Sequence, residues 1–172
     1  MTREALERLF TRHGRSIYYF CLHLTGQRES GEELFQETVL KTMEVSGRIR
    51  EDDELISARN YCMGIAVRLY RNRARKEAMH PVLSLDDDQS GIGFRISNDL
   101  TPEESALRLR EMQEVRAAIR ALPEKLRETV YLFYYAEQPL QEIAKTLRIP
   151  EGTVKSRLNT AKKRLRKMLE EK

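Results

Sequence analysis

Residues 140–169 read LQEIAKTLRIPEGTVKSRLNTAKKRLRKML. The first eight of them place apolar side chains at helical spacing, which predicts a short helix, and these side chains are Ile143, Ala144 and Leu147. Residues 148–150 (Arg-Ile-Pro) break the pattern and predict a turn, and a long helix is expected from about Glu151. Small Ala144 and apolar Val154 suit the crossing of two helices. The stretch therefore predicts a helix-turn-helix.

The long helix has two chemically different faces. Its apolar face spans an arc of about 100° and consists of Val154, Leu158, Ala161, Leu165, Met168 and Leu169. Seven cations and no acid lie between Thr153 and Met168, whereas a helix that faces only water usually alternates Glu with Lys. Small and amide side chains near its start can approach base edges, and the later cations can reach phosphates. Arg157 lies between the faces, so it either flanks the core or contacts a phosphate.

The charge is unevenly distributed along the chain. Residues 59–76 and residues 140–172 each carry net +6, and residues 77–107 between them carry net −6, although the whole chain has only +4. Two separate cationic blocks are what a protein with two contacts to a polyanion needs.

The remaining sequence predicts an all-α fold. Helices are expected over about residues 3–24 and over residues 58–76, and another is expected to start at a capping box formed by Ser30 and Glu33. In the helix over 58–76, the side chains of Tyr61, Ile65 and Leu69 are expected to point inward. Pro81, Asp86-Asp87-Asp88, Gly91 and Gly93 mark a flexible acidic linker, and Pro102 restarts a helix. We therefore predict two small helical domains, residues 1–78 and 103–172, joined by a linker over 79–102. The C-terminal domain has four helices, including the helix-turn-helix.

Composition excludes several classes of protein. The chain has two cysteines, Cys21 and Cys62, and both lie in apolar runs, so we expect two buried thiols. The three histidines are not spaced as metal ligands, and no glycine-rich phosphate loop or nucleophile elbow is present. We therefore predict no metal, no cofactor and no enzymatic activity. No run of about 18 apolar residues is present, so we predict a cytoplasmic protein without membrane insertion.

Three segments together resemble a known family. Residues 122–169 (LPEKLRETVYLFYYAEQPLQEIAKTLRIPEGTVKSRLNTAKKRLRKML) resemble the fourth conserved region of bacterial sigma factors, the extracytoplasmic-function (ECF) group in particular. Residues 24–44 (LTGQRESGEELFQETVLKTME) resemble that family's polymerase-binding segment, and residues 58–76 (ARNYCMGIAVRLYRNRARK) resemble its promoter-melting segment. The resemblance covers nearly the whole chain outside residues 78–105.

The resemblance implies a role for each segment. Contacts with core RNA polymerase would come from Glu33, Leu34, Gln36 and Glu37. The single strand of the minus-ten element would be held by Arg59, Tyr61, Arg68, Arg71, Asn72, Arg73 and Arg75, because cations bind the backbone and planar groups stack on bases. The duplex minus-thirty-five element would be read by Thr153, Lys155, Ser156, Asn159 and Lys163. The implied partners are core polymerase, promoter DNA and an anti-sigma factor.

Several positions depart from the family pattern. Tyr61 stands where the family often has Trp, so it is either a stacking platform or a core residue, and Asn72 replaces Asp. Arg148 replaces a Gly at a turn where a left-handed backbone would cost about 1 kcal/mol. Asp86, Asp87 and Asp88 either mimic nucleic acid inside the polymerase or only solubilise the linker.

Two other functions fit part of the sequence. An operator-binding regulator would use the helix-turn-helix alone, which leaves the cationic block at 59–76 and the acidic helix near 31–46 without a role. A helical adaptor that binds no DNA predicts affinities that hardly change with salt, because only phosphate contacts make binding strongly salt-dependent.

Overall fold

The structure is a computed structural model, and it describes residues 1–50, 52, 54–79 and 102–170. All regular elements in these ranges are helices, as predicted. The N-terminal half consists of α1 (Arg3–Thr25), α2 (Arg28–Glu44), a 3-10 turn η1 (Ser46–Arg48) and α3 (Ile56–Met79). The C-terminal half consists of α4 (Pro102–Arg120), α5 (Glu124–Val130), a π-helical turn η2 (Tyr131–Tyr135), α6 (Leu140–Leu147) and α7 (Glu151–Glu170). The linker acids Asp86, Asp87 and Asp88 lie outside the described residues.

The N-terminal half is a three-helix unit. The Thr2 hydroxyl caps α1 by accepting from the Ala5 amide at 3.2 Å, and Gly26 ends the helix at φ 73°. Gly31 lets α2 lie against α1, since a Cβ there would come within 2.8 Å of the Leu22 Cα atom. Fully buried side chains from all three helices fill the centre, including Leu9, Ile17, Phe20, Leu34 and Met63.

Two helix starts differ from the prediction. Ser30 is not a cap: α2 begins two residues earlier at Arg28, and the Ser30 hydroxyl bonds to the Gln27 side chain at 3.2 Å. The Asp52 carboxylate accepts from the amides of Ile56 and Ser57, at 2.8 and 2.9 Å, so α3 begins before Ala58. An acidic cap is favourable at this end of a helix because it satisfies free amides and opposes the dipole.

The predicted helix-turn-helix is confirmed as α6 and α7. Arg148 makes the turn with φ 55° and ψ 49°, and its amide donates to the Lys145 carbonyl while the Ile149 amide donates to the Ala144 carbonyl. Val154 is fully buried where α7 crosses the rest of the domain. Helix α5 is followed directly by the π turn η2, for which the sequence carries no signal.

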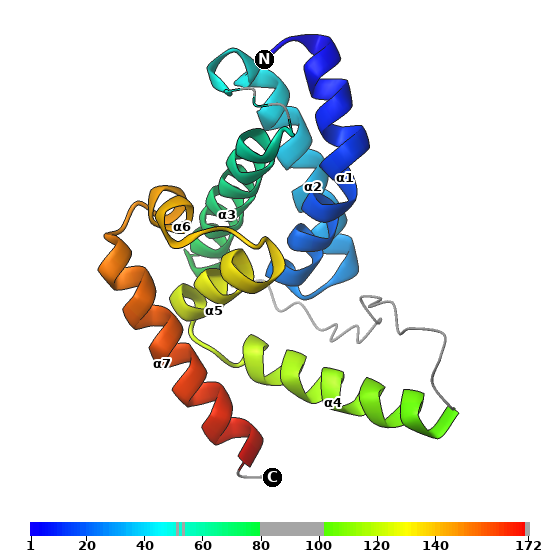
Figure 1. Cartoon of the computed structure of the whole chain (residues 1–172), viewed down its shortest axis with the longest axis vertical. Coiled ribbons are helices and arrows are strands. Elements are labelled where there is room, and N and C mark those ends of the chain that lie inside the picture. Colours follow the sequence, from blue (N-terminus) through cyan, green and yellow to red (C-terminus); the bar gives the residue numbers. More distant parts are fainter. Residues whose placement is uncertain (51, 53, 80–101, 171–172) are drawn as a thin grey trace.

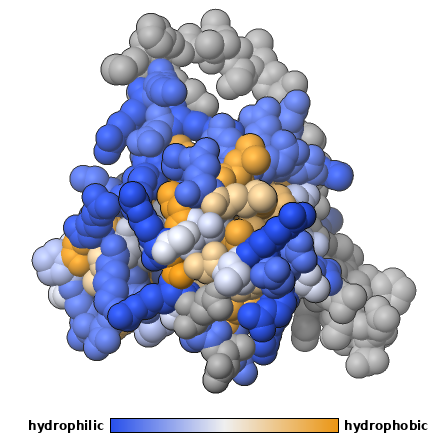
Figure 2. Space-filling view, turned by 90° about the horizontal axis from the view of Figure 1, so that it is seen from above, coloured by the Kyte–Doolittle hydropathy of each residue, from blue (hydrophilic) through white to orange (hydrophobic). Residues whose placement is uncertain are grey.

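The two halves pack against each other. In Figure 1, α5 and α6 lie beside α3, and α4 and α7 extend away from the N-terminal helices. The space-filling view shows hydrophobic residues at the centre of one face, surrounded by hydrophilic ones (Figure 2). One apolar core accordingly includes Val67 of α3 together with Leu132 and Ile143 of the C-terminal half.

Candidate nucleic-acid interface

The five predicted duplex-contact residues all belong to α7. Lys155, Ser156, Asn159 and Lys163 are exposed, and Thr153 is half-buried. The helix keeps a constant orientation because Val154 and Ala161 are buried on its opposite side. Lys155 pairs with Glu151 at 3.0 Å, one turn earlier, and this exposed ion pair can exchange readily for a phosphate. The side chains thus form one polar, cationic surface on a rigid helix.

Arg157 is not part of that surface. Its side chain is half-buried, and its positive charge acts on the carboxyl of Glu128 in α5. Of the two positions that the sequence left open for Arg157, the structure favours the one that flanks the core.

Four of the seven predicted single-strand residues are exposed on α3, namely Tyr61, Arg68, Asn72 and Arg75. The expectation that Tyr61 points inward is wrong, because its side chain is 42% exposed. Helix α3 is covered by α1 and α2 on one side and by α6 on another. Consecutive residues such as Cys62 and Met63 are therefore both buried, and a simple helical period does not identify the core side.

The other three predicted residues are held by partners inside the protein. Arg59 donates to the Ala136 carbonyl at 2.9 Å, and burial lowers the pKa of its guanidinium. Arg71 makes a two-bond ion pair with Glu128, in which Nε lies 2.8 Å from Oε1 and Nη2 bonds to Oε2. Two of the three arginines therefore bind the C-terminal half.

Arg73 belongs to a different arrangement, between α3 and α2. Its guanidinium pairs with Glu33 at 3.3 Å and with Glu37 at 3.0 Å. The same two acids were predicted to bind polymerase. Any contact made by this pair of acids must therefore compete with Arg73 or include it.

A cavity of about 220 Å³ lies between α3 and α6. Tyr61 and Arg68 line it from α3, and Glu142 and Thr146 line it from α6. A Cβ atom at Gly64 would lie 3.4 Å from the Thr146 Cγ2 atom, which is ordinary contact. Helix α6 thus stands over Tyr61 and Arg68, whereas Asn72 and Arg75 line the hollow between α3 and α2.

The predicted polymerase-binding set needs one correction. Glu33, Gln36 and Glu37 are exposed, but Leu34 is completely buried in the core and cannot contact a partner. Two apolar residues on the same side of α2 are exposed instead, Leu40 at 62% and Met43 at 55%. Leu40 and Met43 follow Gln36 by four and seven residues, and this spacing was the sequence signal that they lie on the same side of the helix.

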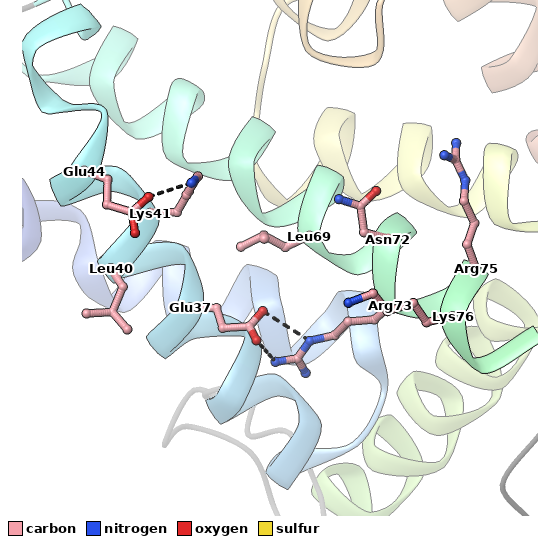
Figure 3. Close-up of a pocket in the computed structure, with 9 residues that line it drawn as sticks. All are labelled: Glu37, Leu40, Lys41, Glu44, Leu69, Asn72, Arg73, Arg75 and Lys76. Atoms are coloured by element: carbon pink, nitrogen blue, oxygen red, sulfur yellow. Dashed lines mark hydrogen bonds and ion pairs between the residues drawn. The ribbon is translucent and has the colours of Figure 1, made fainter. Parts of the chain in front are cut away.

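Figure 3 shows two residues of this surface, Glu37 and Leu40, at the hollow between α2 and α3, which has a volume of about 520 Å³. Glu37 reaches across to Arg73, Lys41 bonds to Glu44, and Leu40 points away from both ion pairs. Exposed apolar side chains beside paired charges are typical of a surface that contacts another protein. We call Glu33, Gln36, Glu37, Leu40 and Met43 the α2 surface.

The described ranges contain neither a membrane-spanning helix nor a cluster of metal ligands. None of the helices in the described ranges is long and apolar enough to cross a membrane. Within those ranges, no three His, Cys, Asp or Glu side chains gather as metal ligands. Cys21 and Cys62 are both buried free thiols, as predicted, and burial raises their pKa values to about 12 and about 11.

Comparisons with known proteins match both halves. The family model for sigma-70 region 2 matches residues 9–79, and the model for sigma-70 region 4 matches residues 112–165. The ECF RNA polymerase sigma factor SigL of Mycobacterium tuberculosis strain H37Rv is 30% identical over 166 residues, which cover 95% of this chain and 88% of SigL. SigW of Bacillus subtilis, also an ECF RNA polymerase sigma factor, is 29% identical over 161 residues, which cover 89% of this chain and 82% of SigW.

Two solved structures share the fold. The sigma factor RpoE of Bartonella quintana, in complex with the anti-sigma factor NepR, aligns with a TM-score of 0.71 at 17% identity. The alignment covers 98% of each chain. CnrH, in complex with the cytosolic domain of CnrY, aligns with a TM-score of 0.66 at 18% identity over 98% of this chain and 90% of CnrH. Both alignments include the two halves together.

Proposed function

The chain belongs to the ECF family of RNA polymerase sigma factors, and on this premise we propose that α7 and α3 make its two promoter contacts. The protein directs promoter-specific transcription initiation together with core RNA polymerase. The observation that carries the assignment of surfaces is the pair of exposed cationic helix faces, one in each half.

Helix α7 reads the duplex minus-thirty-five element. The exposed Ser156 and Asn159 side chains contact base edges in the major groove, where amide groups can discriminate between bases. Lys155 and Lys163 bind phosphates and set the register, and half-buried Thr153 lies at the rim of the contact.

Helix α3 holds the unwound strand of the minus-ten element. Tyr61 provides a stacking platform, and Arg68 and Arg75 neutralise the backbone on either side of the Asn72 amide. Arg59, Arg71 and Arg73 join this surface only after their internal partners release them.

The α2 surface binds core polymerase. Exposed Leu40 and Met43 supply the apolar centre of the contact, and Glu33, Gln36 and Glu37 supply its polar rim. A basic coiled coil or helix on the polymerase would complement these acids.

The compact arrangement is a resting state. Arg59 and Arg71 bind the C-terminal half, and α6 stands over Tyr61 and Arg68, so the α3 face is only partly available to DNA. We infer that polymerase binding separates the halves and that an anti-sigma factor holds them together. RpoE aligns over both halves while bound to its anti-sigma factor NepR, which supports this inference.

The remaining functional assignments follow from this role. The protein needs no cofactor and no catalytic activity of its own, because the polymerase performs the chemistry. We place it in the cytoplasm, where the polymerase and its template are found. Weak contacts from two linked domains add through their effective concentration, so neither half has to bind promoter DNA tightly alone.

Run-off transcription tests the proposal. Purified protein and core polymerase should produce one defined transcript from DNA taken upstream of the protein's own gene, and core polymerase alone should not. Band shifts on the same DNA should require core polymerase. A tight, specific shift by the protein alone would favour the operator-binding regulator, and absence of any association with core polymerase would overturn the assignment.

A further inference from the structure

Glu128 of α5 is the fully buried carboxylate among the described residues, with 1% of its side chain exposed. Both its oxygens accept from Arg71 of α3, in the two-bond geometry that suits a guanidinium. When a buried carboxylate loses such a partner, the folded protein is strongly destabilised, because the charge is left buried and uncompensated. Separation of the halves would remove Arg71, so Glu128 needs a replacement within its own half.

Arg157 of α7 is suited to be that replacement. Helix α5 packs against α7, and the Arg157 charge acts on the Glu128 carboxyl. The Arg157 Nη1 atom is buried and has no hydrogen-bond partner among the described residues. Buried donors are rarely left without a partner, so this unfilled donor on the helix that packs against α5 is a notable exception.

The surroundings favour an exchange of partner. A carboxylate offers about four acceptor positions, and Arg71 occupies two of them. The acid Glu124, one turn earlier on α5, also acts on Glu128 and would make an unpaired carboxylate still less favourable. The pair with Arg71 fixes α5 to α3, whereas a pair with Arg157 would fix it to α7.

We propose that Glu128 is a positioning residue that exchanges Arg71 for Arg157 when the two halves separate. The exchange ties α7 to α5 and fixes the angle at which Ser156 and Asn159 meet the major groove. Release of Arg71 also returns a cation to the α3 face. The duplex contact and the single-strand contact thus become available together. This inference rests on the proposed function, because it assumes that α3 and α7 both bind promoter DNA.

A double-mutant cycle on the full chain tests the exchange without DNA or polymerase. Glu128→Gln and Arg157→Gln are combined, and unfolding by urea is followed in the natural background and in an Arg71→Gln background. The coupling between Glu128 and Arg157 should be small in the first background. In the second it should change the unfolding equilibrium constant about tenfold. Arg71→Gln keeps an amide donor beside Glu128, and Arg71→Met is the second variant should the first not fold.

A spectroscopic measurement separates exchange from a general loss of packing. Slowed rotation of the Arg157 guanidinium, seen in side-chain NMR, should appear on Arg71→Gln substitution and disappear when Glu128→Gln is added. The matched control is Glu114→Gln, an exposed acid on α4, which should leave the Arg157 signals unchanged. Arg157 signals that do not respond to loss of Arg71 would overturn the exchange while leaving the sigma-factor assignment intact. A failure of run-off transcription would overturn the proposed function, whereas the Arg157 response would still show that Glu128 can exchange its partner.

Discussion

Arg148 shows how one residue carries local strain within the predicted DNA-binding motif. Its backbone has φ 55° and ψ 49°, the left-handed region that glycine adopts without penalty. The turn still forms because Ile143, Leu147 and Val154 are buried on both sides of it. Packing of the two helices therefore compensates for the unfavourable turn residue.

Replacing this residue tests the compensation. Arg148→Gly should increase the free energy of unfolding by about 1 kcal/mol, because the left-handed backbone no longer clashes with a Cβ atom. Urea denaturation at neutral pH measures the change. Arg148→Ala removes the same exposed side chain but keeps the Cβ, so it should give no comparable gain; equal gains would mean that the side chain, and not the backbone, causes the strain.

His23 is a second residue whose environment is set by both halves. Its ring is buried, lies 4.1 Å from the Tyr135 ring and 5.9 Å from the Tyr131 ring, and faces the charges of Arg116 and Arg120. Burial first, and then these two arginines, lower the pKa of His23 to about 4. The imidazole is therefore neutral in the folded protein at neutral pH.

The consequence is a pH-dependent stability. Between the unfolded pKa of about 6.5 and the folded pKa of about 4, the unfolded chain binds the extra proton, so stability is full above this window and falls as pH is lowered through it. The loss reaches about 1.4 kcal/mol per pH unit. His23→Phe should make the free energy of unfolding less dependent on pH within this window, measured by urea denaturation at several pH values. His13→Gln serves as the control, and parallel curves for the natural protein and His23→Phe would contradict the prediction.

At the scale of elements, α2 and α7 carry separable functions. Each is a long helix with one buried side and one exposed side, and the exposed sides differ in charge, acidic with apolar residues on α2 and cationic on α7. A substitution confined to one exposed side should therefore change one activity.

For α7, Lys155→Glu with Asn159→Ala should reduce promoter-specific transcription at least about tenfold, since each good base or phosphate contact contributes about 1–3 kcal/mol. The affinity of this double variant for core polymerase should stay within about twofold of the natural protein's, because the substituted side chains are far from α2 in the chain and lie on another element. Run-off assays and a polymerase-binding titration measure the two properties.

For α2, Glu37→Lys with Leu40→Ala should weaken core-polymerase binding about tenfold, through loss of apolar contact and reversal of charge. Leu34 is unsuitable for this test, because its truncation would open a cavity in the core. Arg3→Glu reverses an exposed charge on α1 and is the control for both pairs. If the α2 and α7 variants lost the same property, the division of roles would be wrong.

At the scale of the whole molecule, the two halves share one core and several polar contacts. Arg71 binds Glu128, Arg59 binds the Ala136 carbonyl, and the Arg127 guanidinium donates to the Tyr70 hydroxyl at 2.7 Å. Each contact joins α3 to the C-terminal half. If the resting-state proposal holds, the protein must break all of them to engage promoter DNA.

A reversible cross-link tests that requirement. A Cβ at Gly64 would lie 3.4 Å from the Thr146 Cγ2 atom, so Gly64→Cys with Thr146→Cys should form a disulfide between α3 and α6. The buried Cys21 and Cys62 thiols, with their raised pKa values, should stay out of the reaction. The oxidised protein should lose run-off activity and recover it on reduction. Each single-cysteine variant is a control, and full activity of the cross-linked form would show that separation is unnecessary.

Much of this protein was predictable from sequence because local patterns specify local structure. The alternation of apolar and cationic residues in 151–169, with Pro150 before it, determined α7 and its exposed face. The buried cysteines and the helical class followed equally directly. In contrast, Ser30 has the composition of a cap and is not one, because the helix was free to begin earlier at Arg28.

Only the tertiary structure decided the environment of residues whose partners are distant in the chain. The sequence identified Arg59, Arg71 and Arg73 as cations of a single-strand surface, yet their carbonyl and carboxylate partners lie on other helices. Exposure of Tyr61 likewise depends on which helices cover each side of α3. Hydrophobic periodicity predicts one buried side for each helix, whereas α3 has two buried sides because both halves pack against it.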